Sequence, residues 1–157
     1  MKFAFLAAAL AVLAAGPAFA QGCDLIIASQ VKGLSTPTRS TMTFTMNGKS
    51  YTIVSIAVGT KVYTAKADGT WQADTLGTNE DKIRKTWSAY DCTSGGSDTI
   101  DGELADIVLH HDDGKIPMDT RFWISRATGL GLRTETTMPN GSLISVYDYK
   151  DVQVPAP

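Results

Sequence analysis

Two adjacent histidines precede two aspartates in His110-His111-Asp112-Asp113, the one local cluster of metal-ligand residue types in the sequence. Imidazole and carboxylate groups together suit a transition-metal ion. The residues before them are typical of a β-strand, in which adjacent side chains point to opposite faces. Two histidines placed in this way cannot easily converge on one ion, and Asp112-Asp113-Gly114 fits a solvated turn. We therefore expect a polar strand end here, and no metal or other cofactor.

Two further patterns bear on catalysis. Gly129-Leu130-Gly131 has two of the glycines of a phosphate-binding loop, but the dinucleotide fingerprint needs a third glycine that opens a helix after a parallel strand. A turn followed by the start of a strand explains these glycines. No Gly-x-Ser-x-Gly elbow is present, and the spacing of Ser94, Ser97 and the histidines indicates no catalytic triad. We expect a protein that is not an enzyme, with hydrolysis as the enzymatic alternative.

The sequence contains two cysteines, Cys23 and Cys92. In an exported protein a disulfide between them is the natural interpretation. Such a bond would connect the N-terminus of the mature chain to the middle of the fold. Lipidation of Cys23 is an alternative, although Ala20-Gln21-Gly22 fits a bacterial lipobox poorly. Free thiols are a third possibility.

Residues 1–20 have the pattern of a cleaved signal peptide. Lys2 precedes an apolar run at 3–15, and a breaker pair and the small-residue site 18–20 follow. The apolar run is too short to span a membrane, and no later segment is long enough. We therefore expect export, and a mature chain of residues 21–157 that forms a single domain and is a monomer. The formal net charge of -2, without a cluster of basic residues, argues against a nucleic-acid partner.

Short β-like runs separated by turn pairs dominate the mature chain. Asn47-Gly48, Asp68-Gly69, Asp113-Gly114 and Asn140-Gly141 are strong hairpin signals. They predict antiparallel strands at 41–46, 51–58, 61–65, 70–73, 103–110, 120–125, 130–137 and 142–149. Two short helices are expected, one at 24–33 and one that begins after Asn79. The predicted fold is α+β and mainly β: a curved antiparallel meander, or half-barrel, with one or two short helices packed on it.

Apolar residues recur with a period of two in the strand at 41–46 and lie next to each other in Phe122-Trp123-Ile124. If helices cover one apolar face of a curved sheet, the other can line a cavity for an apolar ligand. Equally, the same side chains can simply fill the core. The candidate ligand-binding residues are Met42, Phe44, Met46, Trp71, Phe122 and Trp123.

Several phrases resemble one family of exported proteins. Residues 39–45 with Asn47-Gly48-Lys49, and then 61–63 before 68–71, are similar to the early strands of the periplasmic lipoprotein-carrier superfamily, the LolA/LppX-like proteins. Residues 122–125, followed by 128–130 and 132–135, resemble its late hairpin, with Gly131 where many relatives carry proline. The ending from Tyr147 to Val152 is also similar.

The resemblance implies a half-barrel whose concave side is closed by helices over an apolar cavity that shields acyl chains. It further implies location in the periplasm, with secretion from the cell as the alternative. The expected function is non-enzymatic binding of a lipid, a lipoprotein or another hydrophobic ligand. The alternative is a cell-envelope interaction or scaffold module that binds a protein partner and has a filled core.

Overall fold

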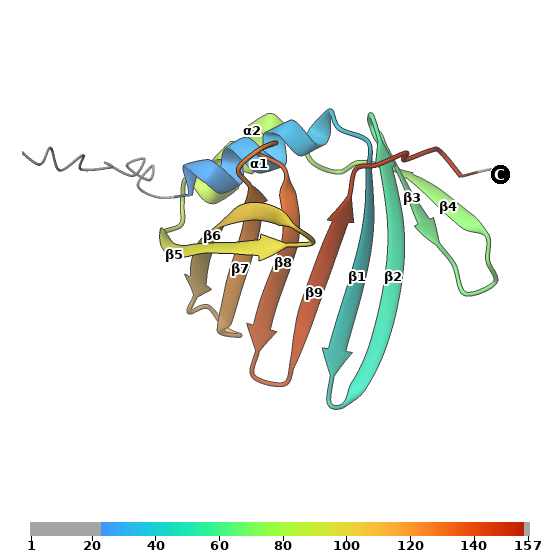
Figure 1. The fold of residues 1–157 in the computed structure, drawn as a ribbon. Helices are drawn as coiled ribbons and strands as arrows, with labels where there is room; N and C mark the ends of the chain where they lie inside the picture. Colours follow the sequence, from blue (N-terminus) through green and yellow to red (C-terminus); the bar gives the residue numbers. More distant parts are fainter. Residues whose placement is uncertain (1–22, 156–157) are drawn as a thin grey trace, which may run out of the picture.

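The computed structural model describes residues 23–155, so the expected signal peptide at 1–20 lies outside the described residues. This part of the chain forms two helices and one sheet of nine strands (Figure 1). The elements in chain order are α1 (Asp24–Leu34), β1 (Thr38–Met46), β2 (Lys49–Val58), β3 (Lys61–Ala65), β4 (Trp71–Thr75), α2 (Glu80–Trp87), β5 (Cys92–Ile100), β6 (Glu103–Asp112), β7 (Met118–Ser125), β8 (Gly131–Met138) and β9 (Gly141–Asp148).

The strands pair in the order β4-β3-β2-β1-β9-β8-β7-β6-β5, and every pairing is antiparallel. Within β1–β4 and within β5–β9, each strand pairs with the next strand in the chain. The pairing of β1 with β9 joins these two meanders at the centre of the sheet. The sheet is curved and open, as Figure 1 shows, which confirms the predicted antiparallel half-barrel with two short helices.

Both helices lie at the same end of the sheet (Figure 1), and α1 contacts α2, β7 and β8. Asn79 caps α2, because its side chain accepts a hydrogen bond of 2.9 Å from the backbone N–H of Lys82. Glu80 and Asp81 occupy the first turn, where carboxylates interact favourably with the helix dipole. Among the described residues, neither helix is long and apolar enough to cross a membrane.

The sequence signals located most of the turns. Asn47 and Gly48 both have positive φ angles, 49° and 75°, in the tight turn between β1 and β2. Such a turn requires left-handed backbone at both central positions, which asparagine and glycine tolerate. The hairpin signal therefore identified both the location and the backbone geometry of this turn.

Strand β5 was missed by the sequence analysis. Its residues are polar and rich in glycine, and nearly all of them are exposed at the edge of the sheet. A bulge between Ser94 and Gly96 shifts its register against β6. In Figure 1 the strand crosses in front of β7, and the carboxylate of Asp98 accepts a hydrogen bond of 3.4 Å from the indole of Trp123 on that strand. The β5–β6 hairpin therefore folds back over the sheet face that carries the Trp123 side chain.

Candidate functional site

A cavity of about 530 Å³ lies between the two helices and the sheet. Its volume is within the range of about 300–1,000 Å³ that is usual for small-molecule sites. Helices α1 and α2 contribute Ile26, Leu34 and Ile83 to the lining, and strands β1 and β3 contribute Met42 and Val62. The walls are therefore largely apolar and come from elements that are distant in the sequence.

Strand alternation determines which side chains face this cavity. Ser40 and Met42 line it from β1, and Ser55 and Ala57 line it from β2. These residues are two apart, so they share the concave face of the sheet. Residues that pair across neighbouring strands share a face, and Ser40 pairs with Ser55 of β2 and with Tyr147 of β9. The concave face therefore continues across these three strands.

Four of the six candidate ligand-binding residues lie on the concave face. Met42 and Phe122 are among the residues that line the cavity. Phe44 and Met46 follow Met42 with the same alternation, but they lie farther along β1, outside the cavity lining. A role for these four residues in binding a ligand stays a prediction.

The two candidate tryptophans belong to the opposite face of the sheet. Trp71 pairs with Ala65, which is three residues from the cavity-lining Val62 and therefore out of phase with it. Trp123 is among the lining residues, but its side chain alternates with that of Phe122. The Trp123 ring lies 5.7 Å from the guanidinium of Arg133 and bonds to Asp98, so it packs on the convex side.

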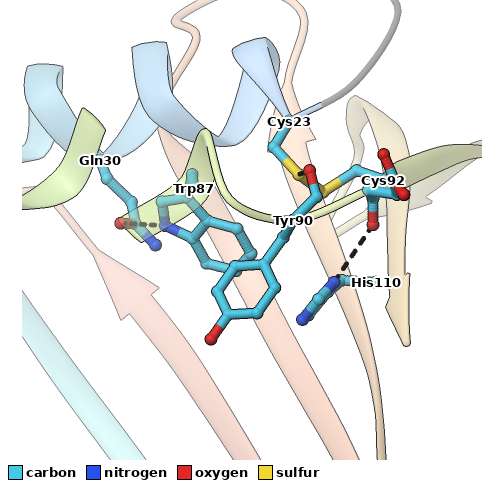
Figure 2. The surroundings of a disulfide bond; sticks show 7 residues. Cys23, Gln30, Trp87, Tyr90, Cys92 and His110 are labelled. Carbon is cyan, nitrogen blue, oxygen red and sulfur yellow. Dashed lines mark hydrogen bonds between the residues drawn. A yellow bond between two sulfur atoms is a disulfide. The ribbon is translucent and has the colours of Figure 1, made fainter. Parts of the chain in front are cut away.

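The predicted disulfide between Cys23 and Cys92 is confirmed, and it fixes the start of α1 to the start of β5 (Figure 2). Beside it the indole N–H of Trp87 in α2 donates to the side-chain oxygen of Gln30 in α1 at 2.9 Å. Around the bond Cys23, Ile26, Cys92, Val108 and Ile124 form a buried cluster. A covalent bond, a hydrogen bond and buried apolar side chains thus hold the helices over one end of the cavity.

The two histidines lie on opposite faces of β6, as strand alternation predicts. His110 is buried against Tyr90 at a ring-centroid distance of 4.6 Å (Figure 2). Its Nδ1 lies 3.2 Å from the carbonyl oxygen of Asp91, which can only accept, so Nδ1 carries the proton. His111 is exposed, and its Nδ1 lies 2.7 Å from Asp119. Within residues 23–155, no three His, Cys, Asp or Glu side chains gather as metal ligands.

Hydroxyl groups form a part of the cavity wall that the sequence analysis missed. Ser29, Ser40, Ser55, Thr134 and Tyr147 all line the cavity. The signal was present for Ser40, because it shares the phase of Met42 in the strand. The remaining hydroxyls come together through register and helix packing, which local patterns do not report.

Tyr149 also lines the cavity, and its hydroxyl donates a hydrogen bond of 2.7 Å to the carbonyl of Gly131. Burial raises the pKa of Tyr149 well above its usual value, so this phenol stays neutral. The cavity wall is therefore uncharged at this position over the whole physiological range of pH.

A curved antiparallel sheet with a pair of helices over an apolar cavity defines the architecture of the LolA/LppX-like half-barrels, and the chain has this fold. No protein-family model matches the sequence, and no curated protein matches it. Solved structures do match. Lipoprotein LppX of Mycobacterium tuberculosis is similar with a TM-score of 0.54 and 10% identity, over 85% of this chain and 97% of that chain.

Two more structures share the fold. LprF of Mycobacterium bovis has a TM-score of 0.52 and 12% identity, over 88% of this chain and 99% of that chain. MucB, solved in complex with MucA(peri), has a TM-score of 0.54 and 13% identity, over 87% of this chain and 60% of that chain. A further MucA/MucB complex comes from Pseudomonas aeruginosa. At these identities the likeness shows the fold alone.

Proposed function

We propose that this protein is a non-enzymatic, exported protein that binds a lipid, lipoprotein acyl chains or another hydrophobic ligand in the half-barrel cavity. The cavity of about 530 Å³ under α1 and α2 is the observation that carries the proposal. Each methylene transferred from water to such an apolar site contributes about 0.8 kcal/mol. The periplasm is the expected location, in agreement with the expected signal peptide.

Ala57 offers a sharp test, because it lines the cavity and its side chain is small. Ala57→Phe should fill the cavity with little effect on folding, and should weaken binding of the apolar fluorescent probe N-phenyl-1-naphthylamine at least tenfold. Val58→Phe is the matched control, since the next residue of β2 points to the opposite face. If Ala57→Phe is folded and binds the probe as tightly as Val58→Phe does, the cavity is not the binding site.

Native mass spectrometry of protein purified without detergent gives an independent measurement. A releasable apolar adduct on the native mass is expected, and it should be absent from Ala57→Phe. Failure of the wild-type protein to bind either the probe or a co-purifying adduct would contradict the proposal.

A second candidate function, as an envelope module that binds a protein, has its own support. MucB has this fold and was solved with MucA(peri). Beyond the cavity, the concave face of this chain exposes Met46, Tyr51 and Ile53, and Tyr51 is 60% exposed. Exposed apolar residues on one face are typical of interaction surfaces. A well-folded protein without ligand that captures an envelope protein through this face would favour the second candidate.

A further inference from the structure

A row of hydroxyl groups crosses the concave face within the cavity. Ser40 of β1 pairs with Ser55 of β2 on one side and with Tyr147 of β9 on the other. Directly paired residues project to the same face, and all three line the cavity. The hydroxyl of Tyr147 lies 3.5 Å from that of Thr134, so the row reaches β8. We call these four residues the hydroxyl row.

Helix α1 places another hydroxyl opposite this row. Ser29 is only 7% exposed and lines the cavity. A Cβ atom added to Gly131 would lie 3.6 Å from the Ser29 hydroxyl and 3.9 Å from the Tyr147 ring. The small residue at position 131 therefore leaves room between the helix and the hydroxyl row.

Two of these hydroxyls lack a protein partner. Within the described part of the chain, the hydroxyls of Ser29 and Ser40 make no hydrogen bond to another residue, although both face the cavity. They are therefore available to a ligand in the cavity, and since a hydroxyl can donate and accept, an alcohol or ester oxygen is a suitable partner.

Charge at the cavity wall disfavours an ionic ligand. Among the described residues that line the cavity, Arg133 is the only charged one. Its side chain shares the convex face with Trp123, where it pairs with Glu135 and lies over the Trp123 ring, although its buried Nε has no hydrogen-bond partner among the described residues. A carboxylate, sulfate or phosphate on the hydroxyl row would lose its water without a cation on the same face of the sheet to pair with, which is unfavourable.

We propose that the cavity selects an uncharged amphiphile, with its apolar chain against the apolar walls and its hydroxyl or ester oxygen on the hydroxyl row. This inference rests on the proposed function and names the ligand class of the same cavity. It makes Ser40 and Ser55 the residues that determine head-group specificity.

A pair of ligands with the same chain tests the inference. The binding of 1-hexadecanol and of hexadecyl sulfate, which stays charged, is measured by displacement of N-phenyl-1-naphthylamine. The wild-type protein should bind the alcohol at least tenfold more tightly than the sulfate. Equal affinities for the two would overturn the inference and leave the proposed function intact, whereas binding of none of the three compounds would overturn both.

Paired variants on the two faces of β1 and β2 complete the test. Ser40→Ala/Ser55→Ala should lose at least tenfold in affinity for 1-hexadecanol and retain its affinity for the apolar probe. Thr43→Ala/Thr52→Ala is the matched control, because Thr43 and Thr52 pair on the opposite face, with their hydroxyls 3.5 Å apart. Unchanged alcohol binding by folded Ser40→Ala/Ser55→Ala protein would overturn the inference.

Discussion

The two ends of the concave face differ in how their apolar side chains are used. At the end that the helices cover, Ile26 of α1 is 1% exposed and packs in the cluster around the disulfide. Toward the turn between β1 and β2, which Figure 1 shows far from the helices, Ile53 is 42% exposed. Both are isoleucines on the same side of the sheet, but only the first contributes fully to the core.

This difference indicates that the two ends of one sheet face have different roles. The covered end supplies buried contacts and the covalent bond, so it stabilises the fold. The uncovered end keeps apolar surface in contact with solvent, which a protein that only needed a stable core would bury. The cavity lies between the two ends, where the covered end can hold the helices in place over it.

Removal of the disulfide at the covered end should cause the largest loss of stability. The Cys23–Cys92 bond spans 69 residues, and the chain-entropy model predicts that it stabilises the fold by about 4 kcal/mol. Cys23→Ala/Cys92→Ala should lower the free energy of unfolding by about this amount in urea titrations. A reducing agent should destabilise the wild-type protein and leave the double variant unchanged. A stability loss below about 1 kcal/mol would show that packing alone holds α1.

Replacement of the two isoleucines compares the ends directly. Ile26→Ala leaves a cavity in a closely packed cluster and should cost about 3 kcal/mol. Ile53→Ala removes a side chain that is already partly in water and should cost less than about 1 kcal/mol. Urea unfolding of both variants measures the difference. Equal losses would contradict the proposed division between the two ends.

Of these tests, the titration of His111 in β6 should show the smallest effect on the stability of the fold. Asp119 raises the pKa of the exposed His111 above the ordinary 6.5, first through their hydrogen bond and then through charge attraction. The folded state therefore binds this proton more tightly than the unfolded state. The resulting stabilisation is complete below pH 6.5 and is lost as pH rises through the folded pKa.

NMR titration of the His111 ring measures this pKa, and Asp119→Asn should bring it down toward 6.5. The same titration curve in the variant would show that Asp119 does not cause the shift. Urea midpoints on the two sides of this transition should differ slightly in the wild-type protein and less in Asp119→Asn.

Local chemistry explains which parts of the fold were predictable. The turn at Asn47-Gly48 and the alternation at Met42, Phe44 and Met46 depend on neighbouring residues, so the sequence reports them directly. Helix α2 was expected to begin after Asn79, and Asn79 caps it because its side chain can accept a hydrogen bond from the first turn. Strand β5 has no alternation because almost none of its side chains is buried.

The candidate site was less predictable, because its walls depend on contacts between distant elements. Met42 and Phe122 could be recognised as apolar residues in strands and do line the cavity. The face of Trp71 depends on register with β3, which no local pattern specifies. Alternation puts Phe122 and Trp123 on opposite faces, but which of them faces the cavity depends on how the sheet is packed. Ser29 enters the cavity wall because α1 is fixed across the sheet.

The strand order has a consequence for how the molecule assembles. Strands β1–β4 and β5–β9 can each form from local hairpins, but β1 must wait for β9, which lies about a hundred residues later, before the central pair closes. The cavity wall draws Ser40 and Ser55 from the first meander and Phe122 and Tyr147 from the second. The cavity is complete only when this junction forms, because its walls come from both sides of it. Binding of the proposed ligand would therefore stabilise the pairing of β1 with β9, so the two would be thermodynamically coupled.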